Sequence, residues 1–463
     1  MATINKSDTM EDHALEAVPA ELRQGWLKLT WNTAGIVTTL IILFFGALTS
    51  FVAGIRIALA AGLFVAVVGS ILGWATGHIA FKTGLSSTVM ARHFGFGRQG
   101  SIIGSVILGF MIIGFLALEN ALLYAGFRFA FGLADTLANQ VMIYGALTVA
   151  WVLLTSYGFE LVSKVSSWTL VAFLALLLYM TVTVVGAHAQ GDILAFPALF
   201  PPEVLAGMNA STDMGKFVFC VNVLIGSAGA LALVDADLGR YAKSSGDIGI
   251  AATLGNIAMS LVMVFVGGVF MFSGMGKIVE HFIGVGKLAP AAAQQAAMSP
   301  DGVTATFLLF GGTLGVLLMV LAQGKAQVLN TYSASLALSN IFDALGARMS
   351  RVVMVVLANV IGLVLVALGI LGQVQAWIEI LGVLTTAFAT VMIVDYYFIN
   401  KSHSYTDEPV NWAGVITVIA ASWLAHYVLN KLIPIQFFSS MLLSALLYPT
   451  LRLTALKPSA TQQ

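Results

Sequence analysis

The amino-acid sequence predicts an all-α integral membrane protein with twelve transmembrane helices. Of its 463 residues, 59% are hydrophobic and only 9% are charged, and the mean hydropathy is +0.95. A soluble chain carries roughly 25% charged residues, so a soluble fold could not bury this much apolar surface. Most of the apolar segments reach the roughly 20 residues that a helix needs to cross about 30 Å of hydrocarbon.

Twelve apolar segments, joined by mostly short connections, account for most of the chain. In chain order they are 29–54, 57–81, 101–118, 136–159, 165–191, 217–234, 248–276, 302–324, 352–378, 377–399, 409–430 and 432–451. The charged residues Glu119, Lys325 and Glu379 lie well inside the apolar stretches rather than near their ends. No Pro- or Ser-rich linker divides the chain, so we expect a single membrane domain at 29–452.

The two longest connections on the expected outer side are 188–216 and 277–301. The first is rich in proline, and the second contains the alanine-rich stretch 289–298. Each of these connections could carry a short surface helix.

The charge distribution predicts the orientation in the membrane. The first 28 residues are polar and mix acidic with basic side chains, so they are not a cleavable signal peptide. An even number of spans places both termini on one side, which we expect to be the cytoplasm. Fourteen lysines and arginines are then cytoplasmic, six are outside and Lys325 lies within a span, as the positive-inside rule requires. We therefore expect a multi-pass protein of the cell membrane with cytoplasmic tails at 1–28 and 453–463.

Several other classes of function are disfavoured. The net charge of zero gives no sign of nucleic-acid binding, and the single cysteine, Cys220, excludes an internal disulfide. The seven histidines are scattered, without the spacing of a metal site or of a metal-dependent hydrolase. The Gly95–Gly100 loop matches G-x-G-x-x-G but follows no strand, so it does not indicate a dinucleotide site. We expect no metal and no cofactor, and an enzyme is disfavoured.

Small residues occur at corresponding places in the first and sixth spans. Thr33-Ala34-Gly35 and Ser227-Ala228-Gly229 each place three small residues within a predicted helix. Glycine-interrupted helices in two halves of a chain are typical of inverted-repeat transporters and mark their binding site, which would include Gly35. The alternative is that these residues only let helices approach closely.

Glu119 is expected near the middle of the membrane, where a charged acid costs roughly 2.5–3.5 kcal/mol on insertion scales. Such a residue is normally paired, protonated, or in contact with water or a ligand, and its alternative role is to lock two helices together. Phe115 lies one helical turn earlier on the same face. The ring could stack on a flat ligand while the carboxylate accepts hydrogen bonds from its N–H groups. For Phe115 taken alone, packing against lipid or the core is the favoured alternative.

The eighth span carries a polar stripe, because Gln323, Gln327 and Asn330 recur at i, i+4 and i+7. Lys325 points about 200° away from the two glutamines on a helix with 3.6 residues per turn. Its ammonium must be neutralised, matched with an acid such as Glu119, or placed near free backbone carbonyls. A purely structural ion pair is the alternative.

Other polar residues lie closer to the ends of their spans. Glu379 lies beside Trp377 in the outer third of the tenth span, and we expect these two residues to form a gate. The alternative for Glu379 is a side chain that reaches for the interface. Asp235 and Asp237 close the sixth span, where Asp237 could pair with Arg240 or anchor the helix end.

Several motifs resemble the nucleobase–cation symporter-1 family. The most specific is the loop from Lys82 to Ser101, which reads KTGLSSTVMARHFGFGRQGS. Supporting motifs are ADLGRY at 236–241, VDYY at 394–397 and NW at 411–412, so the resemblance covers roughly 25–452. The stretch NTYSASL at 330–336 is most similar to the purine–cytosine permease branch.

This resemblance implies a five-plus-five inverted repeat with two extra helices, broken helices one and six, and alternating access. It also implies a central site between spans one, three, six and eight for nucleobases or related rings, including hydantoins, allantoin and thiamine-pyrimidine precursors. Carried over by position, the aromatic platform falls on Phe115 and its polar partner on Glu119. The span-six contacts fall near Ser227, Ala228 and Ala230, and the span-eight amide falls on Gln327, with Asn330 on the same stripe.

The chain departs from the family pattern at two places. The platform is often Trp, and its polar partner is seldom an acid such as Glu119. Sodium-coupled members have two consecutive hydroxyl residues on span eight, where this chain has Lys325 and Ala326. We therefore expect Lys325 to substitute for sodium and Glu119 or Lys325 to change protonation during transport.

The sequence thus predicts a monomeric, proton-driven importer of cytosine or an aminopurine. The alternatives are a sodium symporter for the same bases and a carrier of hydroxymethylpyrimidine, allantoin or hydantoin.

Overall fold

The computed structural model describes residues 17–157, 159–188, 191–285, 288–347, 349–401, 403–405 and 408–457, without the side chains of 157, 159–167, 169, 188, 318, 322 and 325. Throughout this part of the chain the regular structure is helical, as the composition predicts. The principal helices are α1 (Trp26–Val37), α2 (Leu40–Ala53), α3 (Ile55–Thr83), α4 (Ser87–His93), α5 (Ile102–Phe131), α6 (Leu137–Tyr157), α7 (Phe159–His188), α8 (Pro202–Gly207), α9 (Asp213–Gly239), α10 (Ser245–Ile257), α11 (Met263–Gly284), α12 (Pro290–Ala297), α13 (Pro300–Ala344), α14 (Arg351–Ala367), α15 (Val374–Val394), α16 (Trp412–Trp423) and α17 (Gln436–Leu453).

Short π-helical and 3-10 segments extend or connect several of these helices. The π-helical segments are η4 (Ala258–Val262), which joins α10 to α11, η6 (Asp395–Ile399) after α15 and η7 (Leu424–Val428) after α16. The 3-10 turns are η2 (Ala20–Leu22), η3 (Ile193–Ala195), η5 (Ile370–Gln373) and η8 (Leu429–Lys431).

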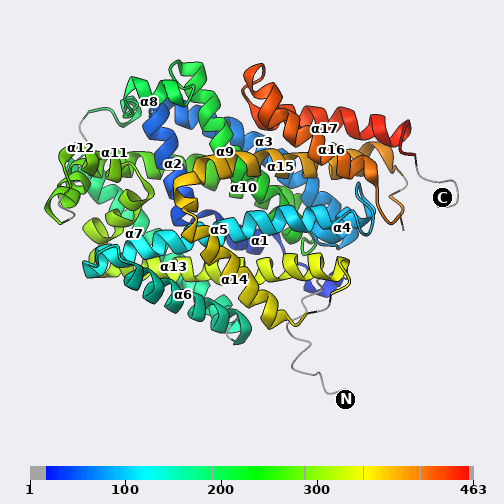
Figure 1. Cartoon of the computed structure of the whole chain (residues 1–463), viewed down its shortest axis with the longest axis horizontal. Coiled ribbons are helices and arrows are strands. Elements are labelled where there is room, and N and C mark those ends of the chain that lie inside the picture. The colour runs from blue at the N-terminus through cyan, green and yellow to red at the C-terminus, as the bar shows by residue number, and fades with distance from the viewer. Residues whose placement is uncertain are drawn as a thin grey trace.

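The structure confirms a multi-pass helical membrane protein. Among the described residues, nine helices are long and apolar enough to cross a membrane, or ten if the bent pair α1 and α2 is one span. Each of the twelve predicted segments coincides with helical structure. However, α14, with 17 residues, is a shorter apolar helix and α17 is not among the candidate spans, so length and composition do not confirm the full count. The predicted surface helices are α8 and α12, at the end of the bundle opposite α4 (Figure 1).

The first span is broken, as predicted, but the break lies a few residues after the predicted one. Thr33, Ala34 and Gly35 are within α1, whereas Thr38 and Thr39 leave the helical conformation, and the axes of α1 and α2 differ by 68°. The Thr38 hydroxyl donates to the Ala34 carbonyl at 2.7 Å. Two consecutive β-branched residues whose hydroxyls can replace main-chain hydrogen bonds favour a break here.

The predicted break in the sixth span is wrong, because α9 runs without interruption from Asp213 to Gly239. Its small residues serve close packing against α15. A Cβ atom added at Gly226 would lie 2.2 Å from the Ile378 carbonyl oxygen, and one at Gly229 would lie 2.2 Å from the Thr385 hydroxyl. The absence of side chains lets the two helices touch, which is the alternative interpretation of such residues in membrane helices.

Two groups of helices position the site. In the first, α3 packs against α9 and α10, and α10 also contacts α1. In the second, α5 packs against α13 and α14. The last two helices, α16 and α17, lie side by side at the edge of the bundle, where α17 also contacts α15 (Figure 1).

Candidate substrate-binding site

A cavity of about 610 Å³ lies between α1, α5, α9 and α13. It extends from Phe115 and Glu119 in the middle of α5 to Lys28 near the start of α1 and to Arg240 and Tyr241 at the end of α9. Most of its surface is apolar, with a few polar side chains, as is usual for small-molecule sites. These four helices are the first, third, sixth and eighth spans, where the sequence predicts the site.

Glu119 borders the cavity and is almost fully buried, with 1% of its surface exposed. Its Oε2 atom has no hydrogen-bond partner among the described residues, and the Thr39 hydroxyl at the break of the first span interacts with the same carboxyl. Leaving a buried polar atom without a partner costs about 1–3 kcal/mol. An incoming ligand can therefore gain free energy by supplying that partner.

Phe115 also borders the cavity, as predicted, and is supported from behind by Trp377. The two ring centroids are 4.9 Å apart with perpendicular planes, a favourable edge-to-face arrangement. Close contact of α15 with α5 requires Gly114, where a Cβ atom would lie 2.4 Å from the Trp377 ring. The structure thus places Trp377 behind the aromatic platform rather than on the cavity wall.

Glu379, the other predicted gate residue, also lies away from the cavity. Its carboxylate accepts hydrogen bonds from Gln375 at 3.1 Å and from Gln436 of α17 at 3.3 Å. These contacts join α15 to α17. A gating role for Glu379 stays a prediction.

The predicted span-six residues divide between two faces of α9. Ser227 and Ala230 border the cavity, and the buried Ser227 hydroxyl has no partner among the described residues. Ala228 faces α3 at Gly69 instead. Gly35 is buried within α1 and is not part of the cavity wall.

Gln327 is buried behind the cavity wall rather than on it. Its side-chain nitrogen donates to the Leu116 carbonyl at 3.0 Å and to the Asn120 carbonyl oxygen at 2.7 Å. Asn120 also accepts from Trp151 of α6 at 2.9 Å, and Asn330 donates to Gln327 at 3.4 Å. These amides and the indole form one network that joins α5, α6 and α13, and only Asn330 in it also borders the cavity.

Lys325 lies within α13, but its side chain is outside the described part of the structure. Its partner and its suggested replacement of sodium therefore stay predictions. The adjacent Ala326 is buried.

The polar residues on the cavity wall that lie outside the predicted set include four neutral ones, Asn32, Thr39, Tyr332 and Ser333. An expectation based on charges inside the spans does not include these four. The signal that could have found Thr39 is the pair of adjacent threonines where α1 ends. The Arg351 guanidinium lies 4.2 Å from the centre of the Tyr332 ring, which holds that side chain at the cavity edge.

Asp237 supports the interpretation of a helix-end anchor. Its carboxylate accepts a 2.7 Å hydrogen bond from the backbone N–H of Ser87, the first residue of α4. The Arg240 side chain donates to the Asp237 backbone carbonyl and stacks on Tyr241. Asp237 therefore ties the short helix of the Lys82–Ser101 loop to the end of α9.

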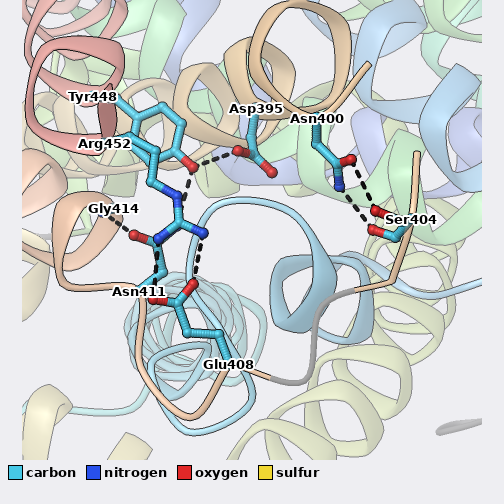
Figure 2. A network of polar contacts seen from close by, with 8 residues as sticks. All are labelled: Asp395, Asn400, Ser404, Glu408, Asn411, Gly414, Tyr448 and Arg452. Carbon is cyan, nitrogen blue, oxygen red and sulfur yellow. Dashed lines mark hydrogen bonds and ion pairs between the residues drawn. The ribbon is translucent and has the colours of Figure 1, made fainter. Parts of the chain in front are cut away.

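The remaining sequence motifs hold the same loop from its other side (Figure 2). Asp395 accepts from the Tyr448 hydroxyl, which in turn accepts from Asn411, and Arg452 forms two hydrogen bonds to Glu408 at 3.0 and 2.7 Å. The backbone of the same segment binds the loop, because Glu408 O accepts from Arg98 N and Asn411 N donates to Phe96 O. These motif residues have a structural role, away from the cavity.

Solved structures with similar folds include those of two transporters. The chain matches Mhp1 in an inward-facing conformation over 98% of its own length and 95% of that chain, with a TM-score of 0.69 and 18% identity. It matches a mutant manganese transporter of Eremococcus coleocola over 96% of its length and 92% of that chain, with a TM-score of 0.50 and 14% identity. No family model matches the chain, and no curated protein matches its sequence. The chain therefore has a fold similar to that of Mhp1, and its sequence motifs resemble those of the nucleobase–cation symporter-1 family.

Proposed function

We propose that the protein is a secondary active importer of a nucleobase, cytosine or a purine, which it carries together with a proton by alternating access. The observation that supports this most is the Glu119 carboxyl, which borders a cavity of about 610 Å³ and has one oxygen atom without a hydrogen-bond partner among the described residues. Phe115, one turn away on the same wall, offers a flat apolar face. A planar ring with polar edge atoms could stack on Phe115 and hydrogen-bond to Glu119 at the same time.

The protonation state of Glu119 would select the edge of the base. A protonated carboxyl offers one O–H donor and one acceptor, whereas a carboxylate is an acceptor only. Cytosine and adenine present a ring nitrogen acceptor beside an exocyclic amino donor, which matches the protonated form. Guanine presents two adjacent N–H donors, which match the carboxylate.

This pairing gives a physical basis for proton coupling. A charge at mid-membrane is costly, so a carboxyl that binds the base as a neutral acid takes up its proton together with the substrate. Release of the base towards water would let Glu119 lose that proton on the same side. The expected replacement of the sodium-site hydroxyls by Lys325 and Ala326 also favours protons over sodium.

The cavity's extent suggests which side is open. It reaches Lys28 and Arg240, which lie on the side that the positive-inside rule assigns to the cytoplasm. We therefore interpret the conformation as open to the cytoplasm, and Mhp1, the structure of similar fold, is also inward-facing.

The decisive experiment is uptake of radiolabelled cytosine in cells that lack their own permeases. The assay includes a protonophore in one arm and replaces sodium with choline in another. We expect uptake that the protonophore abolishes and that does not require sodium. Sodium-dependent uptake would refute proton coupling.

Competition by unlabelled rings tests the substrate separately. We expect cytosine, adenine and guanine to differ in competition, and their order to change with external pH. Absence of cytosine uptake, together with uptake of allantoin, hydantoin or hydroxymethylpyrimidine, would refute the nucleobase assignment but keep the transporter.

A further inference from the structure

Two arginines of the Lys82–Ser101 loop differ from the other described arginines. Among these others, Arg56, Arg128 and Arg452 form ion pairs with Asp192, Asp135 and Glu408, and Arg23, Arg240 and Arg351 stack on the rings of Phe81, Tyr241 and Tyr332. Within the described residues, Arg92 and Arg98 have neither a carboxylate partner nor an aromatic ring. In addition, the Nε atom of Arg92 is buried and has no hydrogen-bond partner among the described residues.

Both of these side chains border one cavity of about 330 Å³, separate from the substrate cavity. Arg92 comes from α4 and Arg98 from the turn before α5, while α13 closes the far side with Asn340, which donates to Thr88 at 3.5 Å. The lining is mostly polar, so the cavity is not built for an apolar ligand. Arg98 is exposed and Arg92 is half-buried, so an anion in this cavity could reach both guanidinium groups and offset their mutual repulsion.

The local backbone adds to the positive potential. Ser101 and Ser105 border the cavity at the start of α5, whose 30 residues place the positive end of a long helix dipole there. The acid on the wall, Asp343, already has a partner of its own. The N–H groups of Arg98 and Gln99 donate to the carbonyls of Glu408 and Pro409, so the side chains rather than the glycine loop would hold a ligand.

We infer that this cavity is an anion site that binds a phosphate group, either the headgroup of an anionic lipid or free phosphate. Guanidinium groups bind phosphate oxygens through paired, charge-assisted hydrogen bonds. The two arginines lie on the side that the positive-inside rule assigns to the cytoplasm, where the membrane surface carries anionic lipids. A phosphate held there would connect α4, which Asp237 ties to α9, with α13 across the two helix groups that form the substrate site.

The experiment measures the thermal stability of the purified full chain in detergent. One arm adds phosphatidylglycerol, one adds phosphatidylcholine and one adds inorganic phosphate. We expect phosphatidylglycerol, inorganic phosphate or both to raise the melting temperature, and phosphatidylcholine to have no effect. Stabilisation by inorganic phosphate identifies free phosphate as sufficient, and stabilisation by phosphatidylglycerol alone identifies the lipid headgroup.

Variants test whether the effect belongs to this cavity. The double variant Arg92→Gln/Arg98→Gln should weaken binding of the stabilising anion at least about tenfold, because two charge-assisted contacts are lost. Lys401→Gln removes an exposed charge at the same end of the bundle and should leave binding unchanged. The double Arg→Lys variant keeps the charge and reports folding, and it should bind with intermediate affinity. An anion effect that is absent in the native chain, or equal in the native and double-glutamine proteins, would overturn the proposal.

Discussion

The side-chain nitrogen of Gln327 on α13 donates a 2.7 Å hydrogen bond to Asn120 on α5. Asn120 directly follows Glu119 on α5. The hydrogen bond from Gln327 therefore holds α5 in the rotation that points the Glu119 carboxyl towards the cavity. Gln327, which the sequence predicts to contact the substrate, is therefore engaged with α5 and does not border the cavity.

Replacing Gln327 with Leu should destabilise the protein and weaken substrate binding together. The Asn120 oxygen and the Leu116 carbonyl each lose a buried donor, which costs about 1–3 kcal/mol per group left unpaired. Gln323→Leu is the matched control, because Gln323 is equally buried one turn earlier and its nitrogen has no partner among the described residues. Thermal unfolding checks the pair, and equal losses in the two variants would contradict the role of the network.

Glu119→Gln should retain cytosine binding but abolish proton-driven accumulation. The amide keeps one donor and one acceptor, which imitates the protonated carboxyl, but it cannot release a proton. Binding is measured with purified protein, and accumulation is measured in cells with and without the protonophore. Accumulation that survives in the variant and still collapses with the protonophore would place the coupled proton elsewhere, with Lys325 the next residue to change.

Phe115→Leu should lower the affinity for the base with little effect on folding. Stacking of a base on an aromatic side chain contributes about 1–3 kcal/mol, so the dissociation constant should rise roughly 5- to 150-fold. Phe110→Leu is the control, because Phe110 also lies near Trp377, with ring centroids 6.1 Å apart, but does not border the cavity. A similar change in both variants would mean that Trp377 packing, rather than stacking on substrate, accounts for the effect.

Gly226→Ala should destabilise the packing of α9 on α15. The added methyl group would meet the Ile378 backbone oxygen, which cannot rotate away, and overpacking of this kind costs about 1–3 kcal/mol. Gly276→Ala in α11 meets no atom within 4 Å, so it should be neutral or slightly stabilising. The melting temperatures of the two variants decide whether the small residues of α9 serve packing.

Arg452→Gln should destabilise the end of the bundle that holds the Lys82–Ser101 loop. Its side chain is 8% exposed and that of Glu408 is 16% exposed, and removing one partner of a buried ion pair costs about 3–5 kcal/mol. The double variant with Glu408→Gln should recover part of that loss, since no unpaired charge remains. A double-mutant cycle on the melting transition measures the coupling, and additive losses would show that the pair contributes little.

The sequence was sufficient for the membrane class and the order of the helices. The resemblance carried by its motifs implies a site between spans one, three, six and eight, where the structure has a cavity. Burying a polar group in hydrocarbon is costly wherever it occurs, so the long uncharged segments and the exceptional Glu119 can be recognised without knowing their neighbours. The placement of Phe115 beside it follows from helix geometry alone. The break in the first span was predicted from its small residues, but its position at Thr38 and Thr39 was not.

The tertiary structure decided which neighbour each side chain meets. Small residues fit both a broken helix and a tightly packed one, and only the contacts of Gly226 and Gly229 with α15 show that α9 continues. Gln327 and Trp377 lie near the predicted site in sequence but support it from behind, and Arg92 and Arg98 share a cavity only because α4, α5 and α13 meet there. Sequence periodicity gives the direction of a side chain relative to its own helix, whereas its partner depends on how that helix is rotated and packed against others.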